Sequence, residues 1–110
     1  MSTAGKGSQL KLLIGFEYTG QGLTLDDIDY FVEFYCWPQN RQKILKSECT
    51  REVVQTQSGD VVNYYAIVNT NVTGAGHLKM VMTATIPDIA APSGYRTEVS
   101  EPYVTNIIIV

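Results

Sequence analysis

Charge is scarce in this sequence, and so are histidine and cysteine. Asp, Glu, Lys and Arg make up 17% of the residues, where an ordinary soluble domain has about a quarter. The low charge fits either a surface that is partly covered in use or a compact β fold that needs few charges. One histidine and two cysteines, with no Cys-x-x-Cys pair, make a poor set of zinc ligands.

Basic residues are too few and too scattered for a nucleic-acid-binding module. The net charge is −3, from eight basic and eleven acidic residues. The densest basic group is Lys43, Lys46 and Arg51, which Glu48 and Glu52 dilute. Because phosphate binding needs a basic stripe on the surface, we expect no direct binding of DNA or RNA.

The apolar segments that mark membrane insertion or secretion are also missing. No apolar run approaches the roughly 18 residues of a membrane-spanning helix. Residues 1–9 contain one Lys and no apolar core, so they do not resemble a secretory signal. We therefore expect a protein that is made in the cytoplasm and has no membrane partner.

No group of residues has the spacing of a catalytic or cofactor site. His77 falls on the polar face of an expected strand, with no Ser, Cys or Asp pattern around it. Asp26, Asp27 and Asp29 lack the ligand spacing of a calcium loop, which indicates a solvated entry to a strand. We therefore expect neither an enzyme nor a cofactor.

The two cysteines are interpreted as packing residues. Cys36 and Cys49 would form a disulfide only if neighbouring strands brought them together. In a reducing cytoplasm, two buried thiols are the favoured state.

Residues that favour β-strands are abundant. Seven Tyr, three Phe and one Trp accompany many Val, Ile and Thr. The strongest strand is predicted over residues 30–37, where aromatic side chains fall on both faces, so neither face is plainly exposed to solvent. Residues 76–86 alternate as a half-buried antiparallel strand. The other expected elements are strands over 10–18 and 43–48, one or two strands over 95–110 with a kink at Pro102, a hairpin of 50–56 with 61–69, and single helical turns over 23–27 and 69–76.

These elements predict an all-β protein of about seven short antiparallel strands. An immunoglobulin-like (Ig-like) β-sandwich fits best, with a small β-barrel as the alternative. Residues 1–8 are small and polar, which indicates a flexible N-terminal arm. Residues 9–110 are predicted to form a single β-sandwich domain.

The last four residues form an apolar run with no polar face. Ile107, Ile108, Ile109 and Val110 would leave large side chains in water if this strand were half exposed. We expect the run to be buried on both faces or covered by an adjacent subunit, which makes Ile107 and Ile109 candidate interface residues.

The order of several short motifs resembles a known group of proteins. They are LDDIDYFVEFY, KILK, YYAIVNT, T-G-x-G-x-L-K-M, IPD, P-x-G-x-R-T-E-V and NIIIV, and the resemblance that they carry extends over roughly residues 9–110. The chain is similar to small Ig-like virion structural proteins of tailed phages, prophages and mobile elements of gut Bacteroides, including crAss-like phages. These are motifs of a β scaffold rather than of chemistry.

The resemblance implies a non-enzymatic protein of the virion. A single domain with an N-terminal arm and an apolar terminal strand favours an auxiliary, or decoration, protein on the outer capsid surface, where many weak contacts add up. Its partners would be the major capsid protein or other virion proteins. A tail or baseplate adaptor, or a fibre-associated domain, is the nearest alternative.

A carbohydrate-binding module is an alternative from another class. Tyr35, Trp37 and Tyr95 would supply flat stacking surfaces for the sugar rings of a glycan. The competing interpretation is that these aromatic side chains pack in the core or in an interface.

Overall fold

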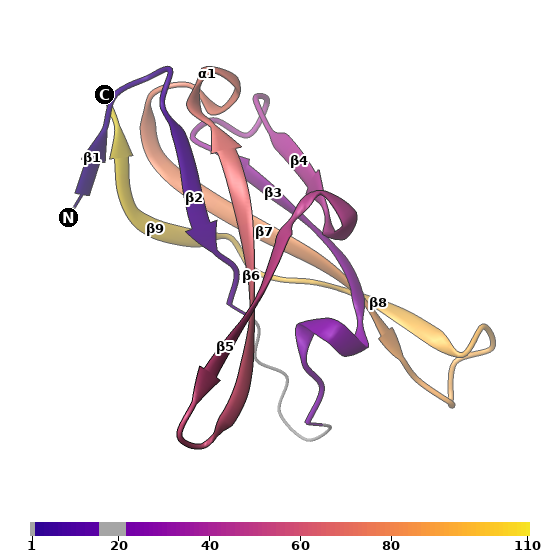
Figure 1. Cartoon of the computed structure of the whole chain (residues 1–110). Helices are drawn as coiled ribbons and strands as arrows, with labels where there is room; N and C mark the ends of the chain where they lie inside the picture. Colours follow the sequence, from indigo (N-terminus) through magenta and orange to yellow (C-terminus); the bar gives the residue numbers. More distant parts are fainter. Residues whose placement is uncertain (1, 16–21) are drawn as a thin grey trace.

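The computed structural model of the chain describes residues 2–15 and 22–110, which form two packed β-sheets (Figure 1). The larger sheet contains, in spatial order, β1 (Ser2–Ala4), β9 (Tyr103–Ile109), β7 (Gly76–Pro87), β3 (Asp29–Tyr35) and β4 (Gln42–Leu45), with β8 (Tyr95–Val99) also paired to β7. The smaller sheet contains β2 (Gln9–Leu13), β6 (Gly59–Asn69) and β5 (Thr50–Thr56). Three short helical turns complete the described elements: η1 (Leu25–Asp27), η2 (Lys46–Glu48) and α1 (Thr70–Thr73).

The strand order is that of an immunoglobulin-like sandwich, which confirms the predicted all-β class. With β8 and β9 taken together as strand G, the larger sheet has the order G-F-C-C′ of a variable-type domain. The smaller sheet has the order B-E-D. The alternative barrel is not formed, because no described strand of one sheet pairs with a strand of the other.

The structure has more strands than the sequence predicts, for two reasons. Residues 95–110, which are expected to supply one or two strands, form two, β8 and β9, which pair with successive parts of the same edge of β7. Between them, the Ser100 side chain continues the ladder: its Oγ accepts from the Met82 N–H at 2.9 Å, and the Ser100 N–H donates to the Met82 carbonyl at 2.8 Å. The second reason is β1, which the sequence analysis does not predict.

The N-terminal segment is not the free arm that its composition indicates. Strand β1 pairs in parallel with β9, with Thr3 opposite Ile108. The Val110 N–H donates to the Ala4 carbonyl at 2.8 Å, and the Lys6 N–H donates to the Val110 carbonyl at the same distance. Small polar residues with little intrinsic preference for a strand are thus held by the open edge that β9 offers.

The C-terminal run alternates between core and surface rather than being buried on both faces. Ile109 is 1% exposed and Ile107 is partly buried against the core. Ile108 is half-buried on the other face, and Val110 is 67% exposed. The chain covers this edge with its own β1, so no adjacent subunit is needed there.

The core lies between the two sheets and follows the alternation of the strands. The buried residues include Tyr30, Val32 and Phe34 of β3, Tyr64, Ala66 and Val68 of β6, Leu78, Met82, Ala84 and Ile86 of β7, and Ile109 of β9. Helix α1 carries the chain from one sheet to the other, as predicted for residues 69–76. It begins after Asn69, whose side chain accepts from the Asn71 N–H at 3.0 Å.

The two cysteines are free thiols at different ends of β3, as their interpretation as packing residues requires. Cys36 follows β3, is 4% exposed, and has its Sγ 3.3 Å from the Gly74 carbonyl. Cys49 follows η2 and packs against the core near Tyr30, at the start of β3. Burial raises the pKa of both thiols, which keeps them protonated and unreactive at neutral pH.

Candidate interaction surfaces

The outer face of the larger sheet, which points away from the smaller sheet, carries cations on aromatic rings. Tyr35 is only 4% exposed. The Arg41 guanidinium lies 4.3 Å from the centroid of its ring, and Lys79 Nζ lies 5.9 Å from the same centroid. On the same face, Lys43 Nζ lies 4.1 Å from the centroid of the Phe31 ring. We call these five residues the cation–aromatic face.

The cation–aromatic face is built by the strand register. Residues directly opposite each other on paired strands point to the same side of a sheet, and Tyr35 is paired with Lys79. Glu33 of the same strand forms a salt bridge with Arg41, with 3.8 Å between the charged atoms. The face is therefore weakly positive in an acidic protein, which suits contact with an acidic surface rather than acid–base chemistry.

A cleft of about 880 Å³ opens between the end of β2 and the β8–β9 edge. Its described lining is mainly apolar, with two acidic residues. The lining includes Leu12, Leu13, Phe34, Met80, Met82, Glu98, Glu101, Tyr103 and Ile107. Large side chains around this edge are exposed: Tyr95 (56%), Val99 (64%), Tyr103 (63%) and Val104 (55%). By register, Tyr103 is opposite Met80 on the side of the cleft, whereas Val104 is opposite Lys79 on the outer face of the sheet. We call these four exposed residues along the edge the β8–β9 strip.

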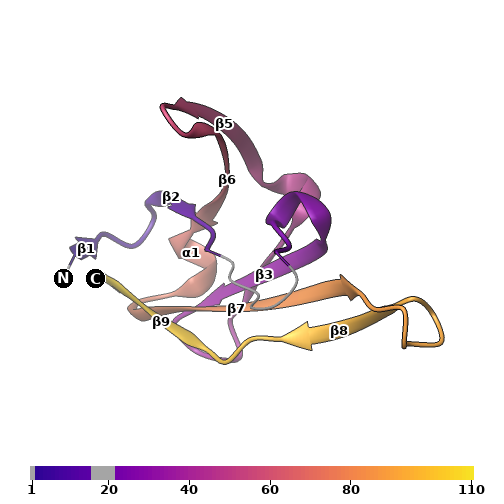
Figure 2. The ribbon, with the colours of Figure 1, turned by 90° about the horizontal axis from the view of Figure 1, so that it is seen from below.

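The hairpin of β5 and β6 projects beyond the sandwich (Figures 1 and 2). All seven residues of β5 are exposed. The outer half of the hairpin presents three large apolar side chains, Val53 (47% exposed), Val54 (37%) and Val61 (45%). Of this half, Val62 is partly buried against the core.

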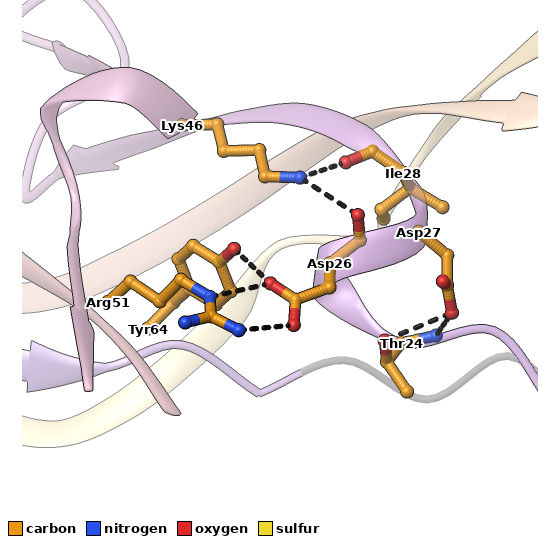
Figure 3. Close-up of polar contacts among 7 residues, drawn as sticks. All are labelled: Thr24, Asp26, Asp27, Ile28, Lys46, Arg51 and Tyr64. Atoms are coloured by element: carbon orange, nitrogen blue, oxygen red, sulfur yellow. Dashed lines mark hydrogen bonds and ion pairs between the residues drawn. The ribbon is translucent and has the colours of Figure 1, made fainter. Parts of the chain in front are cut away.

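A polar cluster attaches the base of the hairpin to the sandwich (Figure 3). The Asp26 carboxylate accepts two hydrogen bonds from the Arg51 guanidinium, from Nε and Nη2, each at 2.9 Å. It also accepts from the Tyr64 hydroxyl. Lys46 Nζ donates to the Ile28 carbonyl at 2.6 Å. The cluster links η1, η2 and both strands of the hairpin.

The electrostatics of this cluster are those of a structural ion pair. The Arg51 guanidinium first, and then the Tyr64 hydroxyl, hold the pKa of Asp26 well below its usual range. Burial, followed by the bond to Asp26, raises the pKa of Tyr64. Asp26 stays ionised and Tyr64 stays protonated at neutral pH, so neither group is poised to transfer a proton.

The role of Asp26 differs from the predicted one. Because the acidic cluster lacks calcium-loop spacing, the sequence predicts only a solvated entry to a strand. The predicted turn itself is present: η1 follows Thr24, whose N–H and hydroxyl donate to the Asp27 carboxylate at 2.8 and 3.0 Å. Arg51 lies 25 positions away in the sequence, and no local pattern connects it to Asp26.

The three aromatic residues proposed for glycan stacking do not form one platform. Tyr35 is covered by Arg41. Trp37 is 55% exposed, with its Nε1–H donating to the Ala75 carbonyl at 2.9 Å, near the start of β7. Tyr95 is opposite Pro87 at the far end of β7, roughly 36 Å away at 3.3 Å per residue.

The remaining predicted site residues are core residues. Ile107 and Ile109 face the space between the sheets, so they are not an exposed interface. The cation–aromatic face, in contrast, has a signal in the sequence. Aromatic side chains on both faces of residues 30–37 already indicate that the second face is covered, and the structure shows that Arg41, Lys43 and Lys79 cover it.

The described residues form no grouping of His, Cys, Asp and Glu that would hold a metal ion. His77 is exposed on β7, opposite Ile108. In the part of the chain that the structure describes, no helix is long and apolar enough to cross a membrane.

No protein-family model, curated protein or solved structure matches the chain.

Proposed function

We propose that the chain is a non-enzymatic structural protein of a phage virion, an auxiliary protein that decorates the outer surface of the capsid. The β8–β9 strip is the observation that carries this proposal. Scattered exposed apolar residues are normal on a protein surface, but a group of them along one sheet edge, of which Val99 and Tyr103 also line an apolar cleft, marks a docking site. The resemblance of residues 9–110 to small Ig-like virion proteins is the reason for proposing that the assembly is a virion.

The strip fits docking on a repeated lattice. Val99, Tyr103 and Val104 lie where β8 gives way to β9, and each is more than half exposed. An apolar side chain gains free energy in proportion to the area that it buries. A contact of this size is weak alone. A capsid, however, offers many equivalent positions, and copies already bound at neighbouring positions favour the binding of further copies.

The proposal is tested with particles that lack the protein. Phage particles are prepared from a strain in which the gene for this protein is deleted, and the purified full chain is added to them. The particles are then sedimented, and the bound copies are counted by quantitative mass spectrometry. We expect saturable binding with many copies per particle. A cryo-EM map of the same sample places the density on the head for a decoration protein, or on the tail for an adaptor.

A double substitution, Val99→Glu with Val104→Glu, tests the strip. Both side chains are exposed, so the fold should tolerate the change, whereas two charges in the contact should reduce occupancy at least tenfold. The matched control is Val72→Glu on α1, where the valine is 43% exposed. Wild-type occupancy of the double variant would exclude the strip as the docking surface, and an absence of wild-type binding would refute the virion role.

A further inference from the structure

Strand β5 offers the longest strand edge that has no partner in the described structure. Its seven residues pair with β6 on one side, and β6 then continues the sheet to β2. On its other side, alternate N–H and C=O groups point away from the sheet. Such an edge is a template for pairing with another strand.

The position of the hairpin leaves this edge accessible. Figure 2 shows the β5–β6 hairpin curving away from the larger sheet, and no described strand pairs with the free edge of β5. The outer part of the hairpin has no third strand, and a two-stranded hairpin is at best marginally stable in water. The exposed Val53, Val54 and Val61 therefore belong to an element that gains most from an additional strand.

The edge also lacks the devices that keep edge strands apart. The two charged residues of β5 are held within the chain: Arg51 pairs with Asp26 at 2.9 Å, and Glu52 pairs with Lys11 at 3.7 Å. Beyond them the strand continues as Val53, Val54, Gln55 and Thr56, with no charge, proline or bulge. By comparison, the short edge strand β4 carries Lys43.

We propose that β5 is a homodimer edge, at which two copies of the chain pair β5 with β5 in antiparallel orientation about a two-fold axis at Val53. The two smaller sheets then become one continuous sheet. This proposal concerns self-association and does not depend on the virion role.

Symmetry and charge together select this register. Two identical antiparallel strands are related by an axis perpendicular to the sheet, so an isologous pair must be centred on a single residue. Centring on Val53, the middle of β5, pairs all seven residues and places Arg51 opposite Gln55 and Glu52 opposite Val54. Centring on Glu52 or Arg51 would bring like charges directly opposite each other, which is destabilising.

The same register brings the exposed valines together. Val53 lies directly opposite its own copy, and Val62, which is paired with Val53 in the hairpin, flanks this contact on the same face. On the other face, Val54 is a diagonal neighbour of its copy, about 7–8 Å away. A single strand pair buries less surface than a standard interface, so we expect a dissociation constant in the micromolar range or weaker.

Sedimentation equilibrium of the full chain over a range of concentrations tests the proposal. We expect the wild-type mass to rise reversibly from the monomer value of 12.2 kDa toward twice that value. Val53→Lys places two like charges at the axis and should weaken dimerisation at least tenfold. Val53→Glu should do the same, while an equimolar mixture of the two variants should recover a dimer, because Lys then meets Glu. Val72→Lys, on an exposed valine of α1, is the control that should remain wild-type.

Circular dichroism spectra that match the wild type confirm that each variant is folded, as expected for a side chain that is 47% exposed. The proposal is overturned if the wild type remains a monomer at the highest soluble concentration, or if Val53→Lys dimerises like Val72→Lys. It is also overturned if the mixture of the two charged variants stays monomeric. If the β5 edge binds only a different protein, the wild type would remain a monomer at the highest soluble concentration.

Discussion

The Asp26 carboxylate holds the base of the hairpin to the sandwich, and its ionisation connects that attachment to pH. Hydrogen bonds from Arg51 and Tyr64 hold the pKa of Asp26 well below the ordinary value of 3.8. A carboxyl group with a depressed pKa in the folded state contributes stability above its unfolded-state pKa, and this contribution is lost as the pH falls. The stabilising contribution of Asp26 is therefore complete and independent of pH near neutrality, and it is lost only below about pH 4.

Asp26→Asn should lower the free energy of unfolding at pH 6, because it removes the charge that Arg51 binds. The difference between wild type and variant should shrink at pH 3, because the Asp26 carboxyl group of the unfolded chain is then largely protonated and must release its proton to form the contact. Urea titrations at the two pH values measure this. Asp60→Asn, beside the exposed turn of the hairpin, is the control. A difference that does not change with pH would show that Asp26 acts through packing alone. Added salt should reduce the effect, because Asp26 and Arg51 are partly exposed.

The cysteines give a second prediction for single residues. Replacing both Cys36 and Cys49 by Ala should leave the fold intact, with a combined loss of about 1–3 kcal/mol from lost packing. The melting temperature of the wild type should be the same with and without a reducing agent, since the thiols lie at different ends of β3. A double variant that is unfolded, together with a wild type that needs oxidising conditions to fold, would instead indicate a disulfide.

At the level of elements, β9 holds one end of the larger sheet together, because it lies between β1 and β7 and pairs with both. Ile109→Ala should cost about 2–5 kcal/mol, the usual range for a fully buried large aliphatic side chain. Val110→Ala should cost less than about 0.5 kcal/mol, because that side chain is mostly exposed. Chemical denaturation of the two variants measures the contrast, and equal costs would contradict the alternation of this strand between core and surface.

Deletion of residues 107–110 should prevent folding altogether. It removes Ile107 and Ile109 from the core, and it also removes the partner strand of β1.

The elements that could be predicted from the sequence are those whose signal is local. Strict alternation identifies β7, a turn between two alternating runs identifies the β5–β6 hairpin, and a Thr–Asp pair identifies the start of η1. The elements that were missed depend on partners far away in the sequence. Strand β1 exists because β9 is available to it, more than a hundred positions later, and residues 2–4 carry no strand pattern of their own.

The candidate surfaces also differ in whether a local signal in the sequence reveals them. Low charge and a second aromatic face already indicate a covered surface at Tyr35, and the structure supplies the cations that cover it. The sequence places Trp37 and Tyr95 in one hypothetical platform, because composition does not reveal that β7 separates them by its whole length. The sequence does not reveal that Val53 and Val54 are exposed, because two valines in a strand are usually buried.

In the molecule as a whole, stability should be distributed unevenly between the sandwich and the hairpin. Val32, Val68 and Leu78 are fully buried between the sheets, whereas every residue of β5 is exposed. Regions with few buried contacts open at lower free energy than the core. We therefore expect the hairpin to be the first described element to open, while the two sheets around the core remain closed.

Amide hydrogen exchange followed by mass spectrometry measures this distribution. In a dilute sample, the amides of residues 52–63 should exchange faster than those of β3 and β7, because only the bonds between β5 and β6 protect them. In a concentrated sample, pairing of β5 with a second copy would give its outward N–H groups acceptors, so exchange in β5 should slow while β7 stays unchanged. The Val53→Lys variant should lose this concentration dependence. If the hairpin exchanges as slowly as β7 in the dilute sample, it is already stabilised within the monomer, and the physical reason for a partner strand at this edge disappears.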